Sequence, residues 1–229
     1  MLDLLQKRHV KNICTSGGHK MKVLLINGSS HENGCTYTAL SEIATILNQE
    51  MIETEIIFLG NKPIRDCTAC RKCMELDDAC IFSDDSINDI IKKAEKADGF
   101  IFGTPVYYAH PSGRILSALD RMFYAASEVF SHKPAAAIAS ARRAGTTASL
   151  DVLNKYFTIA EMPVVSSSYW NMVHGNTPDE VKKDEEGLQI MRNLGRNMSW
   201  LLKCISIGKQ HGTSVPQSER DYRTNFIQS

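Results

Sequence analysis

Short apolar runs alternate with amphipathic helical stretches along most of this 229-residue chain. Five apolar runs have the length of buried strands, and they lie at residues 23–26, 52–59, 98–102, 135–141 and 163–165. Between and after these runs, apolar residues recur at the spacing of one helix face, for example in 40–47, 87–97, 115–123 and 188–201. Strands that alternate with helices predict parallel strand pairs with right-handed crossovers. We therefore expect an α/β fold with a five-stranded parallel sheet between layers of helices.

The first expected strand is joined to the first expected helix by a loop of small and hydroxylated residues, within residues 21–36. Such a loop directs backbone N–H groups at an anion, and the hydroxyls of Ser29, Ser30 and Thr36 add further donors. The N-terminus of the following helix contributes about half a positive charge. This arrangement predicts a phosphate site, and an ordinary strand-to-helix turn is the alternative.

Glycine spacing narrows the class of phosphate site. A Walker A loop has four residues between its glycines and a lysine before its hydroxyl residue. Here five residues separate Gly28 from Gly34, and Cys35 takes the place of that lysine, which argues against nucleoside triphosphate hydrolysis. The dinucleotide fingerprint fails as well, because Ser30 stands at its second glycine position. The loop fits a single terminal phosphate, such as that of FMN in flavodoxin-like folds.

The charge balance limits the partners that we expect. Lysine plus arginine and aspartate plus glutamate number 26 each, so no net positive field favours nucleic acid or an anionic membrane. The sequence shows no apolar run of membrane-spanning length and no secretory signal pattern, which predicts a cytoplasmic protein. We expect one domain at residues 21–205, after an extension at 1–20. The polar tail at 206–229 ends in an apolar anchor, which we expect at a subunit interface.

A cysteine-rich insertion is expected at residues 66–85. Four of the seven cysteines follow the spacing C-x2-C-x2-C-x6-C there, at Cys67, Cys70, Cys73 and Cys80. Three closely spaced thiolates and a fourth from the next loop suit an iron-sulfur cubane. Structural zinc usually takes two separated pairs, and a dithiol motif would leave two cysteines unused. A bound cluster and a set of packed or free thiols remain the two interpretations.

The loop expected after the strand at 98–102 carries Pro105, Val106, Tyr107 and Tyr108. In an open parallel sheet, ligands bind beyond the carboxyl ends of the strands. Two adjacent tyrosines at this place can cover a flat ring. They can also fill a subunit interface, where aromatic residues are favoured.

The loop expected after the strand at 135–141 begins at Ala141 and carries Arg142, Arg143 and Gly145. Two arginines suit the electron-rich edge of a flavin or the phosphate of a nicotinamide donor. Solvated arginines at a helix start are the third interpretation, and they fit the helix dipole poorly.

Structural roles are expected for charged residues at two other helices. Ser86 is a good N-cap for the helix that follows it, and Asp84 and Asp85 are expected to be charges at the same helix start. Asp120 and Arg121 are expected to form a structural ion pair. None of these residues is expected to act as a catalytic acid or base.

The motifs, in their order along the chain, resemble the NADPH-dependent FMN reductase and iron-sulfur flavoprotein group of the flavodoxin-like superfamily. They cover about residues 21–205, and they are NGSSHENGCT, the four-cysteine spacing followed by Asp84 and Asp85, GFIFGTPVYYAHPSG with Leu119, Asp120 and Arg121, and SARRAGTT. The resemblance implies a flavodoxin-like three-layer α/β/α sandwich with FMN bound noncovalently at the strand ends. It also implies assembly as a homodimer or homotetramer.

The resemblance assigns three groups of residues to FMN. The phosphate would be held by Ser29, Ser30, His31, Gly34, Cys35 and Thr36. The ring would be lined by Pro105, Val106, Tyr107 and Tyr108 on one side, and by Ala141, Arg142, Arg143 and Gly145 at the opposite edge. The chain departs from the usual family pattern by Ser30 and His31 in place of Pro-Arg, and by Cys35 in place of Asn. These departures imply weaker or more pH-dependent phosphate binding.

The activity implied is electron transfer from NAD(P)H through FMN to a small-molecule or redox-protein acceptor, such as a quinone, another flavin or an iron centre. The flavin carries the chemistry, so no catalytic side chain is expected. The alternative is an electron carrier with a 4Fe-4S cluster at the four cysteines, supplied with electrons by a ferredoxin. A ligand-binding regulatory module without turnover is the third hypothesis.

Overall fold

The computed structural model describes residues 20–222, 224 and 226 of the chain. Residues 1–19 of the expected extension, and 225 and 227 of the expected anchor, lie outside the described residues. The strands are β1 (Lys22–Asn27), β2 (Glu53–Phe58), β3 (Gly99–Tyr107), β4 (His110–Pro111), β5 (Ala135–Ala141) and β6 (Met172–His174). The helices are α1 (Cys35–Gln49), η1 (Lys72–Glu75), α2 (Ile87–Glu95), α3 (Gly113–Phe130), α4 (Thr146–Ile159), α5 (Pro178–Val181) and α6 (Glu185–Gln210).

Five strands form a parallel sheet in the order β2-β1-β3-β5-β6. The short β4 pairs antiparallel with the end of β3, with Tyr107 opposite His110. Because β1 lies between β2 and β3, the carboxyl end of β1 places Asn27 beside both Phe58 and Gly103. In a doubly wound sheet, ligands bind beyond the strand ends at this point of reversal, and we call this edge of the sheet the crevice. The predicted five-stranded parallel sheet is confirmed.

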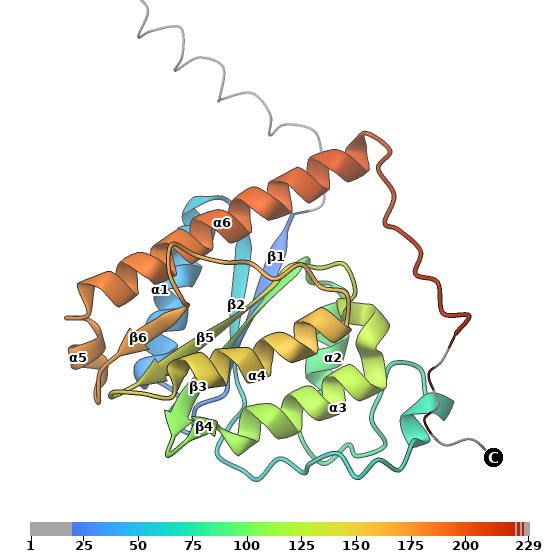
Figure 1. Ribbon diagram of the computed structural model, residues 1–229, viewed down its shortest axis with the longest axis horizontal. Helices are drawn as coiled ribbons and strands as arrows, with labels where there is room; N and C mark the ends of the chain where they lie inside the picture. Colours follow the sequence, from blue (N-terminus) through green and yellow to red (C-terminus); the bar gives the residue numbers. More distant parts are fainter. Residues whose placement is uncertain (1–19, 223, 225, 227–229) are drawn as a thin grey trace, which may run out of the picture.

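Helices cover both faces of the sheet (Figure 1). α1 and α6 pack together on one face, and α2, α3 and α4 cover the other. Side-chain alternation along β1 divides its apolar residues between the two layers. Leu24 and Ile26 join the core under α2, α3 and α4, whereas Val23 and Leu25 join the core under α1 and α6. The three-layer sandwich is therefore confirmed as well.

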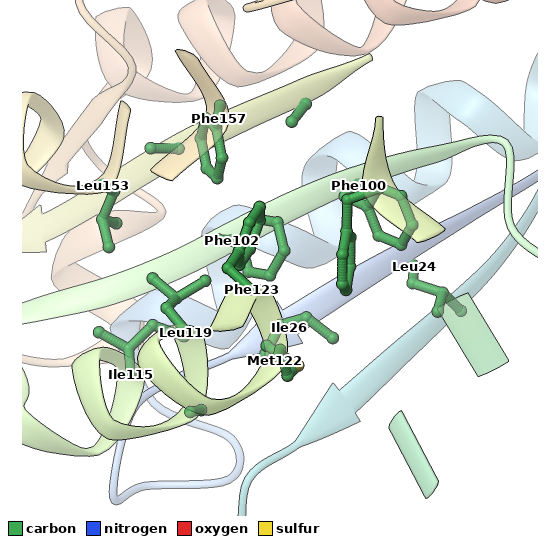
Figure 2. Packing of buried hydrophobic residues seen from close by; sticks show 14 of the residues in the cluster. Leu24, Ile26, Phe100, Phe102, Ile115, Leu119, Met122, Phe123, Leu153 and Phe157 are labelled. Atoms are coloured by element: carbon green, nitrogen blue, oxygen red, sulfur yellow. The ribbon is translucent and has the colours of Figure 1, made fainter. Parts of the chain in front are cut away.

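Aromatic rings fill much of the core between the sheet, α3 and α4 (Figure 2). The ring of Phe102 on β3 stacks on that of Phe157 on α4, with centroids 5.3 Å apart. Phe123 on α3 lies 6.1 Å from the same Phe102 ring. Each such pair adds about 0.5–1.5 kcal/mol beyond its buried area. The packing fixes α3 and α4 relative to β3, and so helps to position the loops that precede these helices.

The last strand differs from the prediction. Val164 makes an isolated bridge with Ala135 and is 41% exposed, so 163–165 is not a strand. The strand is instead β6, whose residues pair with the end of β5. Pro163 lacks an N–H for a ladder, and the run around it is too short to continue one. The chain touches the sheet edge at Val164, leaves it, and returns at Met172.

Three expected boundaries also shift. β3 continues through Tyr107, so residues 103–107 belong to the strand and not to a loop, and β4 pairs with its end. The charged stretch at 179–186, whose composition predicts an exposed linker, contains most of α5 and the start of α6, because Thr177 and Asp184 cap these helices. α6 continues to Gln210, past the expected start of the tail at 206. No helix in the described part of the chain has the length and apolarity to cross a membrane.

Candidate functional site

The loop between β1 and α1 is held in shape by its own side chains. Asn27 is fully buried; its Oδ1 accepts the Ser29 N–H at 3.1 Å, and its Nδ2 donates to the Glu32 carbonyl at 3.0 Å. Ser29, also buried, accepts the His31 N–H on its Oγ at 3.0 Å. Asn27 is missing from the residues predicted from the sequence, although asparagine before a turn is a recognised signal. The loop is preshaped, and Ser30 and His31 form its more exposed side.

Gly28, the first residue of this loop, approaches β3 and α3 too closely to carry a side chain. Its N–H donates to the Gly103 carbonyl at 2.8 Å, and its own carbonyl accepts from Ser112 Oγ at 2.7 Å. A Cβ on Gly28 would lie 2.7 Å from the Cβ of Ile115. Ser112 Oγ also accepts the Ile115 N–H and so caps α3. One buried hydroxyl therefore joins the loop to the helix beside it.

Two helices begin at the crevice with glycine N-caps. α1 follows Gly34 and α4 follows Gly145, and neither helix has a side-chain cap or an acidic residue in its first turn. By contrast, the side chains of Ser112, Thr177 and Asp184 cap α3, α5 and α6. Uncapped N–H groups and the positive ends of two helix dipoles therefore meet at one sheet edge.

The side chains of the first two α1 residues are engaged elsewhere. Thr36 is buried, and its Oγ1 lies 2.8 Å from Ser140 Oγ of β5. The half-buried Cys35 thiol donates to the Gly175 carbonyl, with 3.6 Å between sulfur and oxygen. Burial, with the charge of Glu180, raises the pKa of this thiol, so it stays protonated at neutral pH. At these two positions the helix offers its backbone N–H groups to an anion.

The end of β3 forms the second side of the crevice. Pro105 is buried and Val106 is half-buried, so this segment presents mainly backbone and apolar surface. Tyr107 and Tyr108 are exposed, and Tyr108 has a left-handed backbone with φ 64°. Such a conformation costs a non-glycine residue about 1–2 kcal/mol. The β3–β4 turn holds Tyr108 in this conformation at the mouth of the crevice.

Tyr107 reaches the phosphate loop with its hydroxyl, although the sequence predicts that it lines a ring. Its Oη accepts the Ser30 N–H at 3.2 Å and lies 2.7 Å from Ser30 Oγ. Burial alone would raise the pKa of Tyr107. Hydrogen bonds from Ser30 and Ser29, together with the charge of Arg114, outweigh burial and lower the pKa. The surroundings of this oxygen therefore favour negative charge.

The loop between β5 and α4 closes the third side. Ala141 ends β5 and is buried, whereas Arg142 and Arg143 are exposed. Gly145 has φ 91°, and a Cβ on it would lie 2.8 Å from Val106 Cγ1. Only glycine suits both the conformation and the contact. The close approach places the two arginines next to the end of β3.

The four cysteines of the predicted motif line a second pocket, together with residues of α3. The segment around η1 lies beside α3 (Figure 1). All are free thiols; Cys70 is exposed and the other three are half-buried. Ala69 and Arg71 have left-handed φ values of 52° and 58°, so the chain turns tightly at Cys70. Burial raises the pKa of Cys73, and a backbone hydrogen bond at Lys72 lowers that of Cys70. No three His, Cys, Asp or Glu side chains of the described residues are arranged around a single metal ion.

Arg121 of α3 is buried beside this pocket, with 1% of its surface exposed. It donates to the carboxylate of Asp85, to Cys80 Sγ at 3.3 Å, and to the carbonyls of Phe82 at 2.9 Å and Arg65 at 3.3 Å. Burial would lower the pKa of the guanidinium, but Asp85 and Cys80 outweigh it and raise the pKa. One permanently charged group thus fastens the cysteine-rich segment to α3.

Two predictions about this region need correction. Ser86 stands at the N-cap of α2 as predicted, but its side chain makes no capping bond, and Asp85 instead accepts the first N–H of α2 at 3.1 Å. Arg121 pairs with Asp85 and not with Asp120, whose carboxylate accepts the Tyr156 hydroxyl. The physical reason is that consecutive helix residues do not face each other. Arg121 points to the cysteine-rich segment, and Asp120 points to α4.

Comparisons with known proteins agree with this geometry. The model of a family described as NADPH-dependent FMN reductase matches residues 21–177. The chain belongs to this family. It is similar to an iron-sulfur flavoprotein of Methanocaldococcus jannaschii, 32% identical over 196 residues, which cover 81% of this chain and 99% of that protein. A second iron-sulfur flavoprotein of the same organism is 28% identical over 201 residues, with 80% and 98% covered.

A solved structure shows the same fold. An archaeal flavodoxin superposes on the reductase with a TM-score of 0.54 at 12% identity, over 80% of this chain and 99% of the flavodoxin. The predicted flavodoxin-like fold and the predicted family are confirmed. The protein is accordingly an FMN-binding oxidoreductase.

The residues at the crevice of this reductase fit FMN. Two glycine-capped helix starts offer donors to a phosphate and to the polar edge of a ring. The structure brings together the β1–α1 loop with the first turn of α1, the end of β3 with the turn after it, and the end of β5 with the β5–α4 loop. These segments carry all fourteen residues predicted for the flavin. The four cysteines form a separate pocket against α3.

Proposed function

We propose that FMN binds in this crevice, with its phosphate at the start of α1 and its ring beside the end of β3 and the β5–α4 loop. One observation carries the proposal: the two described helices that begin with an uncapped glycine both open on the same sheet edge. Negative charge is stabilised at such helix starts, and the ring has exposed tyrosines and arginines beside it.

Bound FMN supplies the electron-transferring chemistry, and the residues of the chain bind and orient. The exposed guanidinium groups of Arg142 and Arg143 suit the phosphate of NADPH, because arginine matches phosphate with paired N–H donors. Electrons then pass to a small-molecule or redox-protein acceptor, such as a quinone, another flavin or an iron centre. Because the flavin carries the chemistry, no side chain is assigned a role as a catalytic acid.

Stopped-flow absorbance tests this function. We expect NADPH to bleach the flavin of the FMN-loaded protein rapidly. The double variant Arg142→Ala/Arg143→Ala should raise the apparent Kd for NADPH by about tenfold or more, because charged hydrogen bonds contribute about 1.5–3 kcal/mol each. The same variant should change the apparent Kd for NADH much less.

Arg196→Ala is the matched control, since Arg196 is exposed on α6, in the layer on the opposite face of the sheet from α4. Equal losses for NADPH and NADH in the double variant would contradict the role of the arginines in phosphate binding. If neither nucleotide bleaches the flavin, the reductase function itself is wrong.

We propose a 4Fe-4S cluster at the four cysteines as a second function, in which the protein also carries single electrons, for example from a ferredoxin. The supporting observation is that four free thiols line one pocket with a buried guanidinium beside it. A cubane places four irons and four sulfides between its ligands, so the thiols need not converge on one ion. Four cysteine thiolates are the usual ligands of a 4Fe-4S cluster, so these side chains fit it.

Iron and acid-labile sulfide analysis after anaerobic purification tests this second function. We expect about four irons per chain in the wild type, as four cysteines hold in such clusters. Cys70→Ser should lose most of the iron, whereas Cys204→Ser, which changes an exposed thiol on α6, should keep it. A wild-type protein with flavin and no iron would contradict the cluster and leave the reductase function standing.

We also propose that the protein assembles as a homodimer or homotetramer. Large aromatic side chains are exposed, and they include Tyr169, Trp170 and Trp200. Exposed apolar surface of this kind is typical of interaction sites.

Free thiols at all six described cysteines support a reducing, cytoplasmic location.

A further inference from the structure

Five N–H groups of the β1–α1 loop have acceptors within the protein. Four of these acceptors are backbone carbonyls or buried side chains, and they serve Gly28, Ser29, His31 and Gly34. The fifth N–H belongs to Ser30, and its acceptor is the hydroxyl of Tyr107 at 3.2 Å. Tyr107 is 44% exposed. Among these loop donors, Ser30 is therefore the one whose partner is a solvent-accessible side chain.

The Tyr107 hydroxyl occupies a position suited to an anion. It accepts the Ser30 N–H and lies 2.7 Å from Ser30 Oγ, so two polar groups of one residue converge on it. Its lowered pKa shows that nearby donors and Arg114 favour negative charge there. These are contacts that a phosphate oxygen would make at the same loop. A phosphate oxygen in contact with both groups of Ser30 would have to take the place of the phenol oxygen.

We propose that Tyr107 is a latch on the phosphate loop, whose hydroxyl is displaced from Ser30 when the phosphate of FMN binds. The inference rests on the FMN site proposed above. A phosphate dianion is a stronger hydrogen-bond acceptor than a neutral phenol, so it replaces the Tyr107 hydroxyl as the acceptor of the Ser30 hydrogen bonds. Riboflavin has no phosphate and leaves the latch closed.

The fold lets the ring move while the strand stays in place. The backbone of Tyr107 is paired with His110 in the β3–β4 hairpin, and its carbonyl accepts the Ala109 N–H at 2.8 Å. Rotation about side-chain bonds then frees Ser30 without breaking the ladder. The latch therefore competes with phosphate alone and lowers the affinity for FMN relative to riboflavin.

Tyr107→Phe keeps the aromatic ring and removes the hydroxyl. We expect the Kd for FMN to fall about fivefold, the factor that corresponds to one ordinary hydrogen bond. Inorganic phosphate, measured as a competitor of FMN, should also bind about fivefold more tightly. The Kd for riboflavin should not change. All three affinities are measured by titrating the flavin-free protein, with the quenching of flavin fluorescence as the signal.

Tyr169→Phe is the matched control, because Tyr169 is exposed on the segment before β6 and pairs with Trp170. Its three affinities should equal those of the wild type. Weaker FMN binding by Tyr107→Phe with riboflavin unchanged would make Tyr107 a phosphate ligand and overturn the latch. Equal losses of affinity for FMN and riboflavin would show that Tyr107 contacts the flavin ring. An unchanged affinity for FMN would show that the Tyr107 hydroxyl has no role in flavin binding. A wild type that binds no FMN would overturn the flavin site itself.

Discussion

Replacing Arg121 with methionine should lower the free energy of unfolding by about 3–5 kcal/mol, because it leaves the carboxylate of Asp85 buried without its cation. The side chain of Asp85 is only 12% exposed, so water cannot replace the lost partner fully. The substitution also removes the donors to the carbonyl of Phe82 and to Cys80. Urea denaturation followed by circular dichroism measures the loss, and limited proteolysis of residues 65–85 reports the released segment.

The same substitution at Arg114 is the control. Arg114 lies on the same helix, and its guanidinium donates to the carbonyls of Lys62 and Asn61 in a more exposed setting. Arg114→Met should cost less than about 1 kcal/mol. The pair Arg121→Met/Asp85→Asn should recover part of the loss, because no charge is then left buried. Equal stability of the Arg121 and Arg114 variants would contradict the fastening role of Arg121.

Replacing Gly28 with alanine should raise the Kd for FMN by about tenfold or more and lower the free energy of unfolding by about 1–3 kcal/mol. The added Cβ would lie 2.7 Å from the Cβ of Ile115 and 2.9 Å from the carbonyl oxygen of Gly103. Neither neighbour is the end of a flexible side chain, so the phosphate loop itself must shift. Fluorescence titration with FMN and thermal denaturation measure the two effects.

Gly113→Ala is the control for this prediction. Gly113 is the first residue of α3, and no heavy atom lies within 4 Å of a Cβ built on it. The variant should bind FMN as the wild type does, and alanine in a helix should leave stability unchanged or slightly higher. FMN affinity that is the same in the Gly28 and Gly113 variants would show that the loop does not depend on its contact with α3.

The sequence predicts the sheet and the long helices well, because these features depend on residues close together in the chain. The apolar run of β1, the loop after it and the stripe of α1 are each encoded within a few residues, and carboxyl ends of parallel strands meet at one edge. The weak prediction is the last strand. Its three residues have little apolar pattern, and only pairing with β5 defines them.

The sequence by itself determined the α/β fold, the hydroxyl-rich loop after the first strand and the group of four cysteines. Only the tertiary structure decided which groups support them. Ser112 reaches Gly28 across 84 residues, Tyr107 reaches Ser30 across 77, and Arg121 reaches Asp85 across 36. Such contacts depend on how whole helices and strands pack, and the local spacing of apolar residues does not predict that packing. Sequence reasoning therefore predicts which segments form the candidate sites, and packing decides which groups Arg121, Gly28 and Tyr107 contact there.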